Sequence, residues 1–280
     1  MSTLLSVGNV VIDLLLELPA LPAPGDDVTV TASGSSAGGS FNVLAAARRQ
    51  GMRAVYAGAH GTGPFGDAAR SALAAEDIDV LQAPVAGSDT GWDVAITDAA
   101  GERTFLTTVG AEARLDAEML ARARPAPGDV VHVSGYSFAR QPSGDALAVW
   151  VPAVPEGVTV IVDPGPLGAA IPDAVRARAD WWSCAAGESV GGRNRILRRG
   201  AAGCELDGER IPGFEVDAID TNGAGDAHVG VFAASVALGF DPRTAAVRAN
   251  AAAALAVTRR GPATAPTRDE LERFLSEHPG

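Results

Sequence analysis

The sequence of 280 residues contains no lysine, so all 22 of its basic residues are arginine. This absence excludes Schiff-base chemistry on a lysine, and it also excludes the P-loop, whose phosphate-binding motif requires a Gly-Lys pair. A phosphate group bound by this chain would therefore have to be held by the N-terminus of a helix, by arginine or by a metal ion.

Cysteine is scarce, and no long apolar run is present. Cys184 and Cys204 are too few for a disulfide framework, and the four histidines lack the spacing of zinc ligands. The apolar stretch Val10–Leu18 is too short to span a membrane and is interrupted by Asp13 and Glu17. We therefore expect a protein of a reducing compartment, and specifically a cytoplasmic one.

The chain carries an excess of negative charge, with a formal net charge of −12. An acidic surface repels the phosphate backbone of nucleic acids and anionic lipid, so we expect neither nucleic acid nor a membrane as a partner. The hydrophobic fraction of 47% is sufficient for a substantial core in a chain of this length. These values indicate a globular protein of ordinary composition.

Short runs rich in apolar residues alternate with helical segments along the chain. Such runs suit the central strands of a parallel sheet, which is buried on both faces. The runs are residues 4–7, 54–59, 130–134 and 158–163. Helices are expected at residues 42–50 and 67–76, and residues 226–238 read as a buried helix because they are apolar around the whole circumference. We predict one α/β domain over residues 1–280, a three-layer αβα sandwich with a central, mostly parallel sheet.

Other segments have the alternating pattern of strands with one covered and one exposed face. One is the run Val28–Thr31, and the others form a hairpin of Trp92–Thr97 and Arg103–Thr107. We predict that they belong to a small β-sheet lid beside the main sheet, built from about residues 14–36 and 90–108.

The strongest chemical signal is the sequence Asp-Thr-Asn-Gly-Ala-Gly-Asp at residues 220–226, directly before the buried helix. Its glycines leave backbone N–H groups bare at a helix N-terminus, where unsatisfied donors and the helix dipole both favour an anion. Asp226 would lie beside a phosphate bound there, where phosphoryl transfer needs a base. A plain glycine turn with a favourable N-terminal aspartate is an alternative. A calcium loop is excluded, because Ala224 occupies a ligand position and no acidic residue closes the loop.

This motif resembles the C-terminal signature of the ribokinase-like carbohydrate kinases, the PfkB family, and the resemblance extends over nearly the whole chain. It implies an enzyme that transfers a phosphoryl group from ATP to a hydroxymethyl group of a sugar. Asp226 would be the general base, and the N–H groups of Gly223, Ala224 and Gly225 would stabilise the migrating phosphoryl group. The family also implies Mg²⁺, a possible monovalent-cation site near Asp220, and a homodimer formed through the lid.

The resemblance assigns further residues to the substrates and to metal. The residues expected to bind the sugar are Asp13, at the end of the first strand, and Gly38, Gly39 and Asn42, in a glycine-rich turn. The residues expected to bind the nucleotide are Gly200, Gly203, Thr221 and Asn250, and those expected to hold metal are Glu188 and Asp220. Without the resemblance, Asp13 could be a solvated charge and Asn42 could be a helix cap.

One segment departs from the family pattern. Residues 184–188 retain the glutamate of the family's Asn-x-x-Glu motif, but alanine replaces the asparagine. The stretch between residues 188 and 200 is too short to hold the helix that usually follows. We therefore expect a glycine-rich loop there and an open nucleotide site. Arg193, Arg195 or Arg198 would meet phosphate charge in the absence of lysine.

Three other functions stay open on sequence alone. A nucleoside kinase of the same fold would need a shelf for the base, which Phe41 or Trp92 could supply. A non-catalytic sugar- or nucleotide-binding protein on a decayed kinase fold would fit the altered motif, although the intact Asp226 argues against it. A dinucleotide enzyme rests only on a Gly-x-Gly-x-x-Gly match at residues 61–66, which lacks the acidic residue expected after the next strand.

Overall fold

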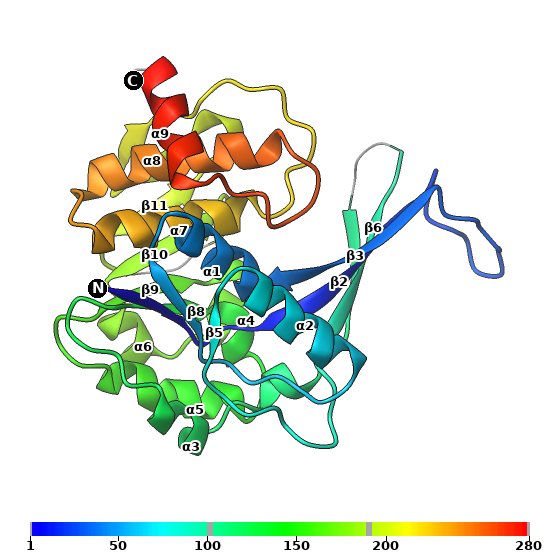
Figure 1. Ribbon diagram of the computed structural model, residues 1–280, viewed down its shortest axis with the longest axis horizontal. Helices are drawn as coiled ribbons and strands as arrows, with labels where there is room; N and C mark the ends of the chain where they lie inside the picture. Colours follow the sequence, from blue (N-terminus) through cyan, green and yellow to red (C-terminus); the bar gives the residue numbers. More distant parts are fainter. Residues whose placement is uncertain (1, 100–102, 189–191, 279–280) are drawn as a thin grey trace.

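The computed structural model describes residues 2–99, 103–188 and 192–278. Its centre is a sheet with the strand order β13-β12-β11-β10-β9-β8-β1-β4-β5 (Figure 1). The strands from β11 to β5 are parallel, and β12 and β13 add an antiparallel edge. The bounds are β1 Thr3–Ser6, β4 Arg53–Tyr56, β5 Asp79–Val80, β8 Val130–Ser134, β9 Thr159–Asp163, β10 Trp181–Ala185, β11 Arg195–Arg198, β12 Cys204–Leu206 and β13 Glu209–Ile211.

Helices cover both faces of this sheet, so the predicted three-layer αβα sandwich is confirmed. Successive strand residues point to opposite faces, and in β1 Leu4 packs with the layer of α1, α2, α7 and α8, whereas Leu5 packs with that of α3 to α6. Helix α9 packs on α8. The bounds are α1 Ser40–Arg49, α2 Pro64–Ala75, α3 Ala117–Arg122, α4 Gly135–Phe138, α5 Ser143–Trp150, α6 Asp173–Arg178, α7 Ala224–Ala237, α8 Pro242–Val257 and α9 Arg268–Glu277, with 3₁₀ turns η1 Ala111–Arg114, η2 Val151–Ala153, η3 Gly165–Ala170 and η4 Gly200–Ala202. No helix in the described part of the chain is both long and apolar enough to cross a membrane.

A second, smaller sheet of order β3-β2-β6-β7 extends to one side of the main body (Figure 1). Its strands are β2 Val10–Glu17, β3 Ala32–Gly39, β6 Trp92–Thr97 and β7 Arg103–Thr107. β2 pairs antiparallel with β3 and parallel with β6, and β6 and β7 form the predicted antiparallel hairpin. This sheet is the predicted lid, although β2 begins at Val10, before the expected limit.

The run Val28–Thr31 is not a strand, and that prediction was wrong. β2 pairs along its whole length with β3 instead, whose sequence Ala-Ser-Gly-Ser-Ser-Ala-Gly-Gly has low strand propensity. The neighbouring strand requires glycine at one position of β3, because a Cβ atom at Gly38 would overlap the carboxylate of Asp13. Packing between strands therefore decides the pairing here, and the Val-Thr alternation does not.

Strands β10 and β11 are parallel neighbours joined only by residues 186–194. Parallel neighbours usually need a crossover of about a dozen or more residues, most often with a helix. Among the described residues of this connection, 186–188 and 192–194, none is helical. The expected loop was nevertheless wrong over Arg195–Arg198, which form β11. Ile196 is fully buried there, but two apolar residues, Ile196 and Leu197, between two arginines are too short a run to predict a strand.

Candidate active site

The 220–226 motif forms a turn that leads directly into α7. Gly223 precedes the helix with a φ of 73°, and a Cβ atom at this position would overlap the carbonyl oxygen of Pro262. Only glycine fits such a conformation and such a contact. The N–H groups that begin the helix lack intrahelical acceptors, and that of Ala224 makes only a long bond of 3.4 Å to the Thr221 carbonyl. This geometry, together with the helix dipole, suits an anion.

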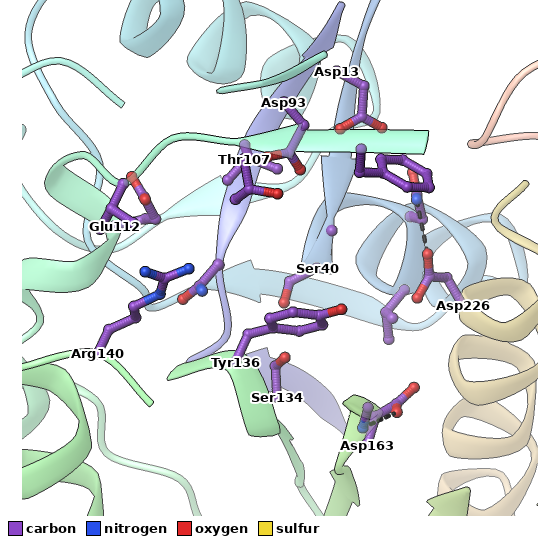
Figure 2. A pocket seen from close by; sticks show the side chains of 18 of the residues that line it. Asp13, Ser40, Asp93, Thr107, Glu112, Ser134, Tyr136, Arg140, Asp163 and Asp226 are labelled. Carbon is purple, nitrogen blue, oxygen red and sulfur yellow. Dashed lines mark hydrogen bonds between the residues drawn. The ribbon is translucent and has the colours of Figure 1, made fainter. Parts of the chain in front are cut away.

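Asp226 lies in the first turn of α7 and faces α1 (Figure 2). The amide nitrogen of Asn42 donates to Oδ2 of Asp226 at 2.8 Å, so Asn42, the third residue of α1, is no helix cap and instead orients the carboxylate. Burial raises the pKa of Asp226 to about 6, with a further contribution from Asp163, while the Asn42 bond and the Arg198 guanidinium act in the opposite direction. A carboxylate with this pKa suits proton transfer near neutral pH.

A cavity of about 340 Å³ opens beside Asp226 under the lid sheet (Figure 2). Asp13 from β2, Asp93 from β6 and Asp163 at the end of β9 line it together with Asp226. An ionised carboxylate only accepts hydrogen bonds, so the matching ligand must supply several O–H or N–H donors. A molecule rich in hydroxyl groups meets that requirement.

Asp13 lies in the middle of β2, in the lid sheet, and not at the end of the first strand as predicted. Burial, followed by the neighbouring Asp93 and Asp226 charges, raises the pKa of Asp13 to about 7. Gly38 touches this carboxylate, and Gly39, with a φ of 61°, lets β3 turn into α1. Of the predicted sugar-site residues, Asp13, Gly39 and Asn42 line the cavity, and Gly38 packs against the Asp13 carboxylate without lining it.

Other residues of this cavity were not predicted. Asp93, whose pKa burial raises, pairs in register with Asp13, and that strand pairing cannot be read from a local pattern. Tyr136 in α4 and Arg140 just beyond it also line the cavity (Figure 2). Asp163 ends a strand that the sequence identified, and its position at a strand end was the available signal.

The two aromatic residues expected to form a base shelf lie elsewhere. Phe41 is buried in the core, and the ring of Trp92 packs 5.7 Å from that of Phe65. Neither lines the cavity, where the aromatic residues are Phe105 and Tyr136. The nucleoside-kinase alternative therefore loses the two residues on which it depended.

The dinucleotide alternative also loses its support. A bound pyrophosphate would need the free N–H groups at the start of α2. Asp89 already occupies them, because its carboxylate accepts from the N–H of Gly66 at 2.8 Å and from that of Phe65 at 3.2 Å. The glycines at residues 61–66 therefore serve a turn capped by an internal carboxylate.

A second cavity, of about 760 Å³, lies on the other side of the turn. The predicted nucleotide residues Gly200, Gly203, Thr221 and Asn250 all line it. Most of its other lining residues are alanine and glycine. Gly203 has a φ of 91°, and a Cβ atom there would overlap the Ile211 carbonyl. The Asn250 amide donates to the carbonyls of Ile211 and Pro212, at 3.2 and 3.1 Å, and so holds the segment that follows β13.

Of the three arginines proposed to meet phosphate charge, only Arg198 lines this cavity. Its Nη1 donates to Oδ2 of Asp163 at 3.1 Å and to the carbonyl of Gly225 at 3.2 Å. Arg193 and Arg195 are exposed and line neither cavity. Because Asp163 lines the cavity under the lid, the Arg198–Asp163 ion pair lies on the boundary between the two cavities.

The two residues expected to hold metal are engaged in hydrogen bonds. Glu188 accepts from the N–H of Ala185 at 2.7 Å and does not line either cavity. Asp220 pairs with Arg103 of the lid at 2.7 Å. Within the described residues, no three His, Cys, Asp or Glu side chains gather as a metal site would require. A Mg²⁺ ion bound here would therefore be held mainly by phosphate oxygens and water.

Comparison with known proteins agrees with this geometry. The model of the pfkB family of carbohydrate kinases matches residues 1–185 and 183–269. The chain belongs to the pfkB family of carbohydrate kinases. These enzymes transfer a phosphoryl group to a sugar hydroxyl. The two matched stretches of this pfkB kinase meet at the end of β10, where the short connection to β11 begins.

Relatives and solved structures cover nearly the whole pfkB kinase. A sugar kinase of Escherichia coli, YegV, is 32% identical over 95% of this chain and 91% of its own length, and a ribose-1-phosphate kinase of Halopiger xanaduensis is 30% identical over 99% of both. The structure of a putative ribokinase II from E. coli with ATP and Mg²⁺ has a TM-score of 0.82 at 23% identity, covering 99% of this chain and 100% of its own. Arabidopsis thaliana ribokinase with ribose and ATP has a TM-score of 0.80 at 22% identity, covering 98% and 99%.

Proposed function

We propose that this pfkB kinase transfers the γ-phosphoryl group of ATP to a hydroxymethyl group of a sugar, with Asp226 as the general base. The observation that carries the proposal is the position of Asp226, which lines the cavity under the lid while the neighbouring Ala224 and Gly225 line the other cavity. A hydroxyl group held beside Asp226 would give up its proton to the carboxylate as its oxygen attacks the phosphoryl group.

The sugar would bind in the cavity under the lid. Asp13 and Asp93 would accept hydrogen bonds from its hydroxyl groups, with Gly38 and Gly39 leaving room for the Asp13 carboxylate and for the chain to turn. Asn42 would act by orienting Asp226, to which it donates at 2.8 Å.

ATP would bind in the second cavity, with its phosphates at the turn. The N–H groups of Gly223, Ala224 and Gly225 would stabilise charge on the phosphoryl oxygens, and Gly200, Gly203, Thr221 and Asn250 would surround the rest of the nucleotide. Mg²⁺ would neutralise phosphate charge, with Glu188 reaching it through water. The ATP and Mg²⁺ in the related E. coli structure support this choice of donor and ion.

We further propose a homodimer through the lid and a cytoplasmic location. β7 is an edge strand of the lid, and Phe105 and Leu106 on it are 49% and 59% exposed. An apolar edge strand of this kind is readily covered by a partner. The free thiols of Cys184 and Cys204 agree with a reducing compartment. Light scattering of the purified protein tests the dimer.

A coupled assay of ADP release tests the kinase activity. The acceptors would be ribose, fructose, 2-keto-3-deoxygluconate, ribose 1-phosphate and inosine, each with ATP and Mg²⁺. We expect ADP release that depends on a sugar acceptor, and phosphorus NMR of the product should show a new phosphomonoester on a hydroxymethyl carbon. Release that ignores the acceptor, or a clear preference for inosine, would contradict the proposal.

A further inference from the structure

The turn that begins at Asp220 is tied to the lid by an arginine. Arg103 is the first residue of β7, and its Nη2 donates to Oδ1 of Asp220 at 2.7 Å and lies 3.1 Å from Oγ1 of Thr221. Both side chains of the ion pair are largely covered, with exposures of 23% and 25%. A pair shielded in this way contributes more than an exposed one.

The oxygen atoms of Asp220 are otherwise occupied by N–H donors. Oδ1 also accepts from the N–H of Asn222 at 2.9 Å, and Oδ2 accepts from the N–H of Gly261 at 3.0 Å. A monovalent cation needs several oxygen atoms with free lone pairs facing it. The surroundings of Asp220 present donors and a guanidinium in their place, so they do not fit such a cation.

We propose that Arg103 supplies the positive charge at Asp220 that a monovalent cation would otherwise supply, so that turnover does not depend on K⁺. Arg103 is then a positioning residue, because it acts on the phosphate-binding turn through Asp220 and Thr221. Since β7 pairs with β6, which carries Asp93, the same contact links the sugar-binding sheet to the turn. The inference rests on the proposed kinase function.

The test compares turnover of one accepted sugar in potassium chloride and in choline chloride at equal ionic strength. The rate of the unmodified enzyme should change by less than about twofold. Arg103→Ala should lose about tenfold in kcat without K⁺, the order expected for one charge-assisted bond, and K⁺ should restore much of the loss. Arg103→Lys should keep most of the rate and stay indifferent to K⁺.

Arg260→Ala is the matched control. Arg260 also bridges the body to the lid, through Glu17 at 3.2 Å, but this pair is exposed and does not touch Asp220. It should leave both the rate and the indifference to K⁺ unchanged. Strong activation of the unmodified enzyme by K⁺, or a slow Arg103→Ala enzyme that K⁺ does not rescue, would overturn the proposal.

A second measurement separates this inference from the kinase activity. K⁺ should raise the melting temperature of Arg103→Ala but not that of the unmodified protein, because only the variant offers an unpaired Asp220 to the ion. This shift needs no turnover. If no sugar is phosphorylated and the shift still occurs, the proposed function fails and the role of Arg103 stands. Equal responses of the two proteins to K⁺ would refute that role.

Discussion

The two cavities that meet at Asp226 are built from different parts of the chain. The one under the lid is lined by charged side chains, Asp13, Asp93 and Asp163 among them, from strands far apart in the sequence. The one behind the turn is lined mainly by alanine and glycine, and its charged side chains are those of Arg198 and Glu215. We infer that the first cavity selects its ligand mainly by side-chain hydrogen bonds, whereas the second holds the nucleotide mainly through backbone groups and small side chains.

The largest effect on activity should come from substitution of Asp226, the residue where the two cavities meet. Asp226→Asn keeps the shape and the contact with Asn42 but removes the base, so kcat should fall by about 10²–10⁴ while the KM for the sugar changes little. Steady-state kinetics on one accepted sugar measures both constants. Asp173→Asn is the control, because Asp173 lies in the first turn of α6 and is fully exposed. A near-normal kcat for Asp226→Asn would remove this residue from the mechanism.

The next effect concerns the boundary between the cavities. Arg198→Met removes the guanidinium that lines the nucleotide cavity and leaves Asp163 without its ion-pair partner, so kcat/KM for ATP should fall by about 10²-fold. The melting temperature should also fall, because a largely buried charge has lost its partner.

The double variant Asp163→Asn, Arg198→Met separates these two consequences. It removes both charges, so the melting temperature should recover while the activity with ATP stays low. Recovery of activity together with stability would show that Arg198 serves only to neutralise Asp163, and that phosphate is held by backbone groups alone.

The pH dependence of kcat should reflect the ionisation of Asp226, the residue where the two cavities meet. The pKa of Asp226 is raised to about 6, and a base must be ionised, so kcat should be constant above that pH and fall about tenfold per unit below it. A profile of kcat between about pH 5 and pH 8 with a saturating sugar measures this. A profile that stays flat below pH 6 would exclude Asp226 as the titrating base.

A smaller effect should come from the lid. Asp13→Ala removes an acceptor for sugar hydroxyl groups, so the KM for the sugar should rise about tenfold with a smaller change in kcat. An unchanged KM would show that Asp13 does not bind the sugar.

Asp13→Asn tests the raised pKa of Asp13 through the stability of the folded protein. The folded pKa of Asp13 is raised from 3.8 to about 7, so folding favours the protonated carboxyl group. The stability that this protonated form contributes is fully present below pH 3.8 and is lost as the pH rises from 3.8 to about 7. The Asn variant should therefore melt higher than the unmodified protein at about pH 8, with little difference at about pH 4. The reverse order would show that the Asp13 carboxylate is stabilised in the fold.

The difference between the cavities also explains what could be predicted from sequence. A site formed by backbone N–H groups requires glycines at fixed positions in the sequence. The 220–226 turn and the Gly200–Gly203 turn could therefore be recognised from the sequence. The carboxylates of Asp13 and Asp93 meet through the β2–β6 pairing, and no local pattern records that pairing. β3 and β11 were missed for a related reason, since neighbouring strands impose their conformation on sequences with little strand propensity.

The smallest expected effect is on the selectivity among nucleotides, and its measurement tests the contrast between the two cavities most directly. The connection of residues 186–194 is short, and Asn250, the amide side chain of the cavity, already donates its amide to two carbonyls. Strong discrimination between bases requires side-chain groups that are free to bond the base, and besides Arg198 the cavity offers Glu215, Thr221 and His228 for this. We expect kcat/KM for ATP, GTP and CTP to agree within about tenfold, with a KM for ATP at or above about 1 mM.

The panel would be assayed with one accepted sugar, after mass spectrometry has matched the protein to the 28.3 kDa of its sequence. Under the same conditions, ribose and its close analogues should differ by more than the nucleotides do, because their cavity offers several carboxylates to mismatched hydroxyl groups. Tight binding that is specific for adenine would show that the nucleotide side also selects through side chains, and the contrast between the two cavities would not hold.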